Sequence, residues 1–219
     1  MSDMKSDTSQ CVLIGDIVGS RTVEDRRVAH ETLVATLAVV EERVPSLRGL
    51  GVTVSDEFQG AYRRLGDALD AAWWVRLLLL PAVDVRIGVG RGVATVIDAA
   101  RGIEDGPAWW AARAAIESVE ETADRAATRL ARTGVRDGTD GADPEEGLRA
   151  VNAALLCRDH LVGSLSDRSL RLLKGLMDDA TQAALAQQEG ISPSAVSQRV
   201  RSDGIGAVLA AHELLRGQP

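Results

Sequence analysis

The segment from Cys11 to Val18 (CVLIGDIV) constrains the fold most, because it is a nearly continuous apolar run broken by one carboxylate. Short runs of this kind are typical of a strand that is buried on both faces. Gly19-Ser20 end the run, and residues 23–44 then carry apolar side chains at helical spacing before Pro45. The chain is therefore expected to begin with a buried strand followed by a long amphipathic helix.

The next ninety residues continue with alternating strand and helix patterns. Two short β-type runs, 51–55 and 58–64, are separated by Asp56-Glu57 and predict a tight hairpin. A helical segment closed by Pro81 follows, then a glycine-rich strand over 83–93 and a further helix over 107–132. This order predicts an α+β fold, a ferredoxin-like sandwich with helices stacked on one face of a mostly antiparallel sheet.

A Gly-rich acidic segment, residues 134–147 (GVRDGTDGADPEEG), separates this pattern from a C-terminal third that is helical throughout. The segment has the composition of a flexible linker. We therefore predict an α+β domain over 11–133, a linker over 134–147 and an all-α domain over 148–219.

Composition narrows the class of protein. Of the 219 residues, 45% are hydrophobic and 26% charged, which excludes a disordered chain. The longest apolar stretch, residues 77–83, is too short to span a bilayer. Cys11 and Cys157 lie far apart with no nearby metal-ligand pattern, so we expect both to be reduced and buried. These features favour a cytoplasmic protein that does not enter the membrane.

Asp16 is the residue that most clearly indicates a site, since an unpaired charge inside a buried strand costs several kcal/mol. Asp56 at the hairpin can approach it if the two strands are neighbours. A divalent cation between them, Mg²⁺ or Mn²⁺, would relieve their repulsion, and hard oxygen ligands suit these ions. The backbone N–H groups of Ile17, Val18, Gly19 and Ser20 could then hold phosphate oxygens. The alternative is that Asp16 caps a turn and Asp56 is an exposed hairpin residue.

Four segments together resemble the class III nucleotide cyclases and their diguanylate cyclase relatives: GDIVGS at 15–20, SDEFQGAYR at 55–63, VRIGVGRG at 85–92 and DGPAWWAARAA at 105–115. The resemblance implies that Asp16 and Asp56 bind two metal ions that activate a ribose hydroxyl and stabilise charge on the α-phosphate. It also implies that Arg113 steadies the transition state from the partner subunit of a homodimer.

Three positions depart from the cyclase pattern. An asparagine four residues before the arginine is Trp109 here, the purine-reading lysine is Val52, and the glycine before the hairpin aspartate is Ser55. Such a site could bind a nucleotide or its phosphates without turning it over. Almost the full length also resembles the SatD family, which combines a region of this type with a C-terminal helix-turn-helix.

The tail carries a helix-turn-helix pattern in residues 181–201. Gly190 permits a left-handed turn, Ser192 is a helix cap, Pro193 suits the first helical position, and Val196 faces inward. The resemblance is to bacterial regulators of the MarR and sigma-factor region four type. The residues left outward, with side chains suited to phosphates and base edges of DNA, are Ser194, Ser197, Gln198, Arg199 and Arg201.

The net charge of the C-terminal third does not favour DNA binding, because residues 151–219 hold seven basic and seven acidic side chains. An αα-hairpin for protein contact is therefore the alternative, and DNA binding would need a homodimer to double the contacts. The leading hypothesis is a DNA-binding regulator that senses a nucleotide or another phosphorylated small molecule. The competing ones are a nucleotidyl cyclase or related phosphoryl-transfer enzyme, and an inert scaffold.

Overall fold

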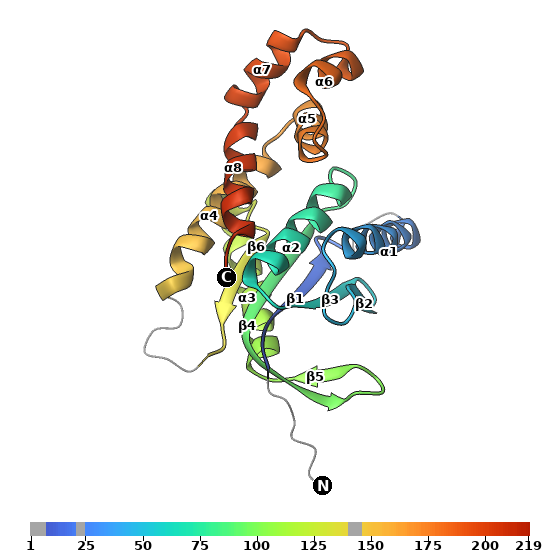
Figure 1. Cartoon of the computed structure of the whole chain (residues 1–219), viewed down its shortest axis with the longest axis vertical. Coiled ribbons are helices and arrows are strands. Elements are labelled where there is room, and N and C mark those ends of the chain that lie inside the picture. Colours follow the sequence, from blue (N-terminus) through green and yellow to red (C-terminus); the bar gives the residue numbers. More distant parts are fainter. Residues whose placement is uncertain (1–7, 21–24, 140–145) are drawn as a thin grey trace.

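The computed structural model describes residues 8–20, 25–139 and 146–219. A twisted sheet forms the body of the molecule, and its central strand is the buried run that opens the sequence (Figure 1). The strands are β1 (Thr8–Ile17), β2 (Gly51–Val54), β3 (Glu57–Tyr62), β4 (Val85–Asp98), β5 (Ile103–Asp105) and β6 (Thr133–Asp137). Their order is β2-β3-β1-β4-β5, and β6 also pairs with β4. All pairs are antiparallel except β4 with β6, which is parallel.

The first two helices lie on one face of the sheet, as the sequence predicts. They are α1 (Arg26–Arg43) and α2 (Leu65–Leu79). A third helix, α3 (Pro107–Ala123), packs against the opposite face, so the expectation of helices on one face alone is wrong. Gly88 and Gly90 of β4 explain this close approach, because a Cβ on Gly90 would lie 2.1 Å from the carbonyl oxygen of Ala108 in α3. A short 3₁₀ turn, η1 (Ala126–Thr128), follows α3.

Side chains of β1 alternate between the two faces. Leu13 and Ile17 join the core under α1 and α2, whereas Val12 and Ile14 pack with α3. The alternation places Asp16 on the α3 face. This placement decides which charged groups the aspartate can meet.

The C-terminal helices do not form a separate core. Helix α4 (Glu146–Gly163) packs against β6, and α8 (Ile205–Arg216) packs against α2. Leu155 and Leu215 belong to the same hydrophobic cluster as Leu13. The predicted linker over 134–147 is also partly wrong: its first four residues belong to β6 and its last two to α4, while residues 140–145 lie outside the described part of the chain.

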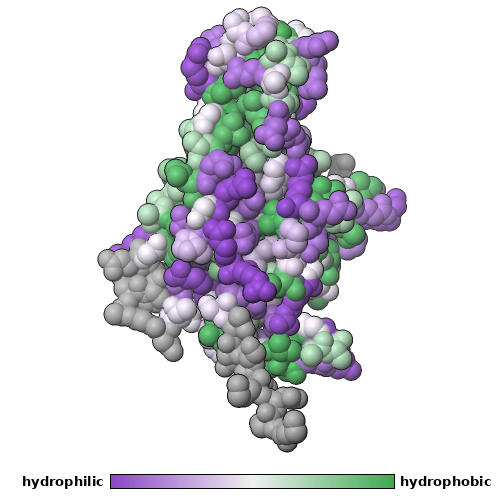
Figure 2. Space-filling view, in the orientation of Figure 1, coloured by the Kyte–Doolittle hydropathy of each residue, from purple (hydrophilic) through white to green (hydrophobic). Residues whose placement is uncertain are grey.

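Three further helices form a lobe at one end of the molecule (Figure 1). They are α5 (Asp167–Met177), α6 (Gln182–Glu189) and α7 (Pro193–Ser202). The local predictions between α6 and α7 are confirmed: Gly190 has a φ of 65°, and the Ser192 hydroxyl caps α7 by accepting from the Ala195 N–H at 3.2 Å. Hydrophilic residues lie on both sides of the tip of this lobe (Figure 2).

Two global expectations can be compared with the structure. Among the described residues, no helix has the length and apolar character needed to cross a bilayer. Cys11 is buried as predicted, whereas Cys157 is exposed on α4, so the prediction that both are buried is wrong for the second.

Candidate functional site

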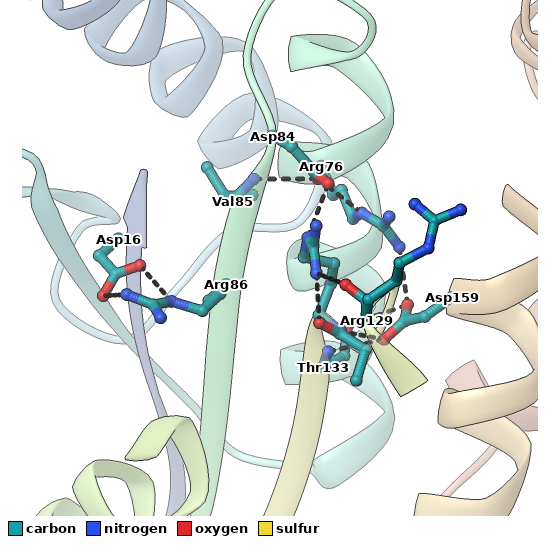
Figure 3. Close-up of polar contacts among 10 residues, drawn as sticks. Asp16, Arg76, Asp84, Val85, Arg86, Arg129, Thr133 and Asp159 are labelled. Carbon is teal, nitrogen blue, oxygen red and sulfur yellow. Dashed lines mark hydrogen bonds and ion pairs between the residues drawn. The ribbon is translucent and has the colours of Figure 1, made fainter. Parts of the chain in front are cut away.

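Asp16 is compensated by an arginine of the neighbouring strand. The register of β1 with β4 sets Asp16 opposite Arg86, and Nε and Nη2 of the guanidinium donate to the two carboxylate oxygens at 3.0 and 3.1 Å (Figure 3). The third nitrogen of the same group, Nη1, pairs with Glu120 on α3. Burial raises the pKa of Asp16, and the bonds from Arg86 act in the opposite direction. The prediction that the charge of Asp16 needs a compensating charge is confirmed, but an arginine side chain supplies it in place of the expected metal ion.

Asp56 lies in the β2–β3 turn and lines a cavity of about 350 Å³ together with residues of α1. Its other lining residues include Ile17, Ser20, Arg26 and His30. Asp16 does not line this cavity, although the charge of Asp56 is near enough to raise the pKa of Asp16. The two aspartates therefore lie at the same end of the sheet, but they point to different surroundings.

The turn after β1 offers fewer free N–H groups than predicted. Val18 donates its N–H to the carbonyl of Asp84 at 2.9 Å, and Ser20 donates to Ile17 at 3.4 Å. Helix α1 begins only at Arg26, where Asp25 caps it through the Val28 N–H. The N–H groups of Val18 and Ser20 would therefore have to leave these backbone bonds before they could hold phosphate oxygens.

A larger cavity, about 690 Å³, opens on the α3 face between the hairpin, β5 and α3. Three positions from the cyclase comparison line this cavity. Val52 and Trp109 depart from the cyclase pattern, and Arg113 matches it. Arg113 donates to both carboxylate oxygens of Glu57 at 2.7 and 2.9 Å, and these bonds raise the pKa of the guanidinium. Trp110 beside it is 62% exposed.

Sequence reasoning missed several residues of this region. Arg48 and Arg101 line the large cavity, and Arg48 forms an ion pair of 2.6 Å with the buried Glu104. Arg86 is the second residue of β4, so its place in a strand could be predicted from the sequence. The register that sets it opposite Asp16 could not.

A second buried ionic cluster lies between α2, β4 and α4 (Figure 3). Arg76 donates to Asp84 at 2.9 Å and to Asp159 at 2.8 Å, and Asp159 also accepts from the backbone N–H groups of Arg132 and Thr133. Burial acts to raise the pKa of Asp84, but Arg76 and Arg132 hold it below its ordinary value. Every carboxylate here is bound by protein donors, which indicates a structural role.

The residues that the structure describes contain no group of three or more His, Cys, Asp or Glu side chains arranged to hold a metal ion. The proposed pair fails for a specific reason, because both oxygens of Asp16 are engaged by Arg86. The donor set at Asp16 and Asp56 therefore does not fit a bound Mg²⁺ or Mn²⁺ as it stands.

The model of the SatD family matches residues 10–215. The chain belongs to the SatD family. None of the curated proteins matches the sequence. The SatD-family match includes the sheet, the large cavity and the helices α4 to α7, and it ends inside α8.

Nucleotide cyclases are among the solved structures similar to this SatD-family chain. A bacterial light-regulated adenylyl cyclase matches at 9% identity with a TM-score of 0.47, over 62% of this chain and 44% of that one. The guanylyl cyclase domain of the RhoGC fusion protein from the aquatic fungus Blastocladiella emersonii matches at 16% and 0.40, over 51% and 76%. The guanylyl cyclase Cya2 matches at 13% and 0.38, over 52% and 72%. The chain thus matches less than half the length of the light-regulated cyclase.

The predicted DNA-contacting residues of this SatD-family chain share one helix, α7. Ser194, Gln198 and Arg201 are exposed, and Ser197 and Arg199 are half-buried. Arg201 donates to the Ser197 hydroxyl at 3.3 Å, and Arg199 lies 3.6 Å from Asp203. Val196 is fully buried on the opposite side of the helix.

Proposed function

We propose that this SatD-family protein is a DNA-binding regulator whose sheet region binds a nucleotide or a related phosphorylated ligand. The observation that carries the first part is the position of α7, at the end of a lobe that projects from the body of the molecule (Figure 1). Its buried side, with Val196, packs on α5, α6 and α8, which leaves its polar side open. A helix presented in this way can enter the major groove of DNA.

Ion pairs between arginines and an acidic residue inside the lobe limit the strength of DNA binding. Arg168 and Arg171 both bind Glu189, and Arg171 does so through two nitrogens at 2.7 and 2.8 Å. These bonds lower the pKa of Glu189. Because acids neutralise part of the basic surface, we expect weak binding by one chain and a homodimer on DNA, with a steep dependence on salt.

The large cavity supports the second part of the proposal. Its lining combines two indoles, Trp109 and Trp110, with the guanidinium groups of Arg48, Arg101 and Arg113. Indole faces stack on planar bases, and arginine binds phosphate oxygens through two parallel bonds. Buried Nε1 of Trp109 has no hydrogen-bond partner within the described ranges, so a ligand acceptor would satisfy it.

The ion pairs argue against the catalytic alternative. A cyclase would need Asp16 free to bind metal and Arg113 free to meet the substrate, yet Arg86 and Glu57 occupy these two groups. Incubation with ATP or GTP and Mn²⁺, followed by chromatography, tests this directly. We expect no cyclic product, and a product that disappears in Asp16→Ala would restore the cyclase hypothesis.

DNA binding is tested by fluorescence anisotropy with labelled random duplexes at low and moderate salt. Arg201→Ala should weaken binding by about fivefold to a hundredfold, the range of one base or phosphate contact. The matched control is Arg27→Ala, an exposed arginine on α1 that lies outside the lobe. Absence of wild-type binding at low salt, or equal losses in the two variants, would contradict the proposal.

Ligand binding is tested through the intrinsic fluorescence of the tryptophans during titration with ATP and GTP. Trp110→Ala should reduce both the affinity and the signal change, because its indole is the exposed one in the cavity. Val28→Ala, at an exposed apolar residue on α1, serves as the control. Titrations that leave the emission unchanged, with no shift in thermal stability, would exclude a nucleotide in this cavity.

A further inference from the structure

The α3 face of the sheet holds two carboxylates, Asp16 and Glu57, near the ends of neighbouring strands. The β1–β3 register pairs Gly15 with Phe58, and the adjoining residue of each strand, Asp16 and Glu57, is acidic. Glu120 approaches from α3, where it is exposed. Three acidic groups of this kind repel one another unless cations lie between them.

Arginine side chains supply the positive charges, and each forms two hydrogen bonds to one carboxylate. The Asp16 carboxylate accepts two bonds from Arg86, and the Glu57 carboxylate accepts two from Arg113. Gln59 adds a third donor to Glu57 at 3.0 Å. The strand-borne carboxylates of this face therefore have their oxygens engaged by protein donors.

We propose that Arg86 is a built-in cation that takes the position of a divalent ion at Asp16, so that this end of the sheet excludes Mg²⁺ and Mn²⁺. The Arg86 side chain is only 19% exposed and is clamped between β1 and α3, since the same guanidinium binds both Asp16 and Glu120. An arginine at such a place carries its charge at all physiological pH values and cannot exchange with solvent as a metal ion does.

The energetic reason for exclusion is competition for the same oxygens. A hard cation binds through open carboxylate oxygens, and here it would have to break the two charge-assisted hydrogen bonds between Asp16 and Arg86. The half-buried guanidinium would then lose Asp16 and keep its pairing with Glu120. Loss of one partner of a buried ion pair is strongly unfavourable. Asp56 lines the cavity next to α1, which Asp16 does not line.

The consequence for the ligand rests on the function proposed above. A phosphorylated ligand in the large cavity would meet arginines directly and would bind equally well with and without divalent ions. The exclusion of metal at Asp16 is nevertheless a property of the free protein, so it can be tested with no nucleotide present.

The experiment is a Mn²⁺ titration of the full chain, in which the electron paramagnetic resonance signal of the free ion measures how much Mn²⁺ remains unbound. Wild-type protein should leave the signal unaffected through the millimolar range. Arg86→Met removes the cation but keeps an unbranched side chain, and it should create one Mn²⁺ site at least tenfold tighter than any wild-type binding. Asp16→Asn added to Arg86→Met should abolish that site. Arg91→Met, which breaks the Arg91–Asp137 pair on the same strand, is the matched control and should gain none.

Two results would overturn the proposal. One is a Mn²⁺ site in the wild-type protein that Asp16→Asn removes. The other is a folded Arg86→Met protein that gains no site, or a gain that Arg91→Met shows equally. If Arg86→Met does not fold, the comparison of wild type with Asp16→Asn decides alone: no Mn²⁺ bound by either supports exclusion, and binding lost in Asp16→Asn refutes it.

Discussion

Lowering the pH should weaken this fold through one buried histidine, His212 of α8. The imidazole is 1% exposed, its ring centroid lies 5.5 Å from that of Trp73, and its Nε2 is 3.4 Å from Asp70. Burial, with smaller contributions from Arg158 and Arg216, lowers the pKa of His212 from 6.5 to about 4. The folded protein therefore keeps the ring neutral at pH values where the unfolded chain would protonate it.

The sign and size of the effect follow from proton linkage. Between pH 6.5 and about 4 the unfolded state binds the proton that the folded state refuses, so the free energy of unfolding falls as the pH falls. Each pH unit in this window removes about 1.4 kcal/mol, which gives about 2 kcal/mol at pH 5 and about 3 kcal/mol below pH 4. Above pH 6.5 the histidine contributes no pH dependence.

Urea denaturation of the wild type and His212→Gln, from pH 7.5 to 4.5, measures this contribution. The difference between the two proteins isolates the histidine, which matters because burial also raises the pKa of Asp70, whose titration acts with the opposite sign. His160→Gln, exposed on α4, is the control and should keep the wild-type slope. Equal slopes in wild type and His212→Gln would refute the reasoning.

Three other substitutions test the packing. Gly90→Ala should destabilise the protein by about 1–3 kcal/mol in urea because its Cβ meets the backbone of α3, whereas Gly51→Ala, with no atom within 4 Å, should be nearly neutral. Ser55→Gly should raise the melting temperature by relieving a φ of 58°, worth about 0.5–1 kcal/mol; an unchanged or lower value would contradict this. Asp159→Ala should cost about 3–5 kcal/mol by leaving Arg76 buried without this partner, and a loss under 1 kcal/mol would show that the cluster adapts.

Local patterns were enough to predict much of the fold. The apolar run of β1, the hairpin and the glycine-rich β4 each show a strand or turn pattern that depends on neighbouring residues alone. The boundaries between α6 and α7 were predictable for the same reason, because Gly190, Ser192 and Pro193 act on the backbone next to them. Such signals need no knowledge of the tertiary structure.

Elements whose stability comes from distant partners were not predictable. Strand β6 lies in a segment with the composition of a linker, and it is a strand because Thr133 and Val135 are buried beside β4 and α3. Trp73 and Trp74 are neighbours on a helix and point in different directions, yet both are buried, since Trp73 faces His212 of α8 while Arg43 of α1 covers Trp74. Both outcomes depend on which elements surround the helix or strand.

The candidate site shows the same limit in its chemistry. A carboxylate inside an apolar strand requires a compensating charge, and that requirement was correct for Asp16. The identity of the compensating group depends on strand register, which sets Arg86 directly opposite. A metal and an arginine satisfy the same electrostatic need, so sequence reasoning could define the problem without choosing between its two solutions.

The position of α8 explains how the two proposed functions can share one chain. This helix follows α7 and packs against α2, and the carbonyls of Gln218 and Pro219 accept hydrogen bonds from the N–H groups of Gly66 and Leu65 at the start of α2. Helix α2 in turn packs against β1, β3 and β4, the strands that carry Asp16, Glu57 and Arg86. A series of packed elements therefore connects the strands of the arginine-clamped end, through α2 on their opposite face and α8, to the helix proposed to read DNA.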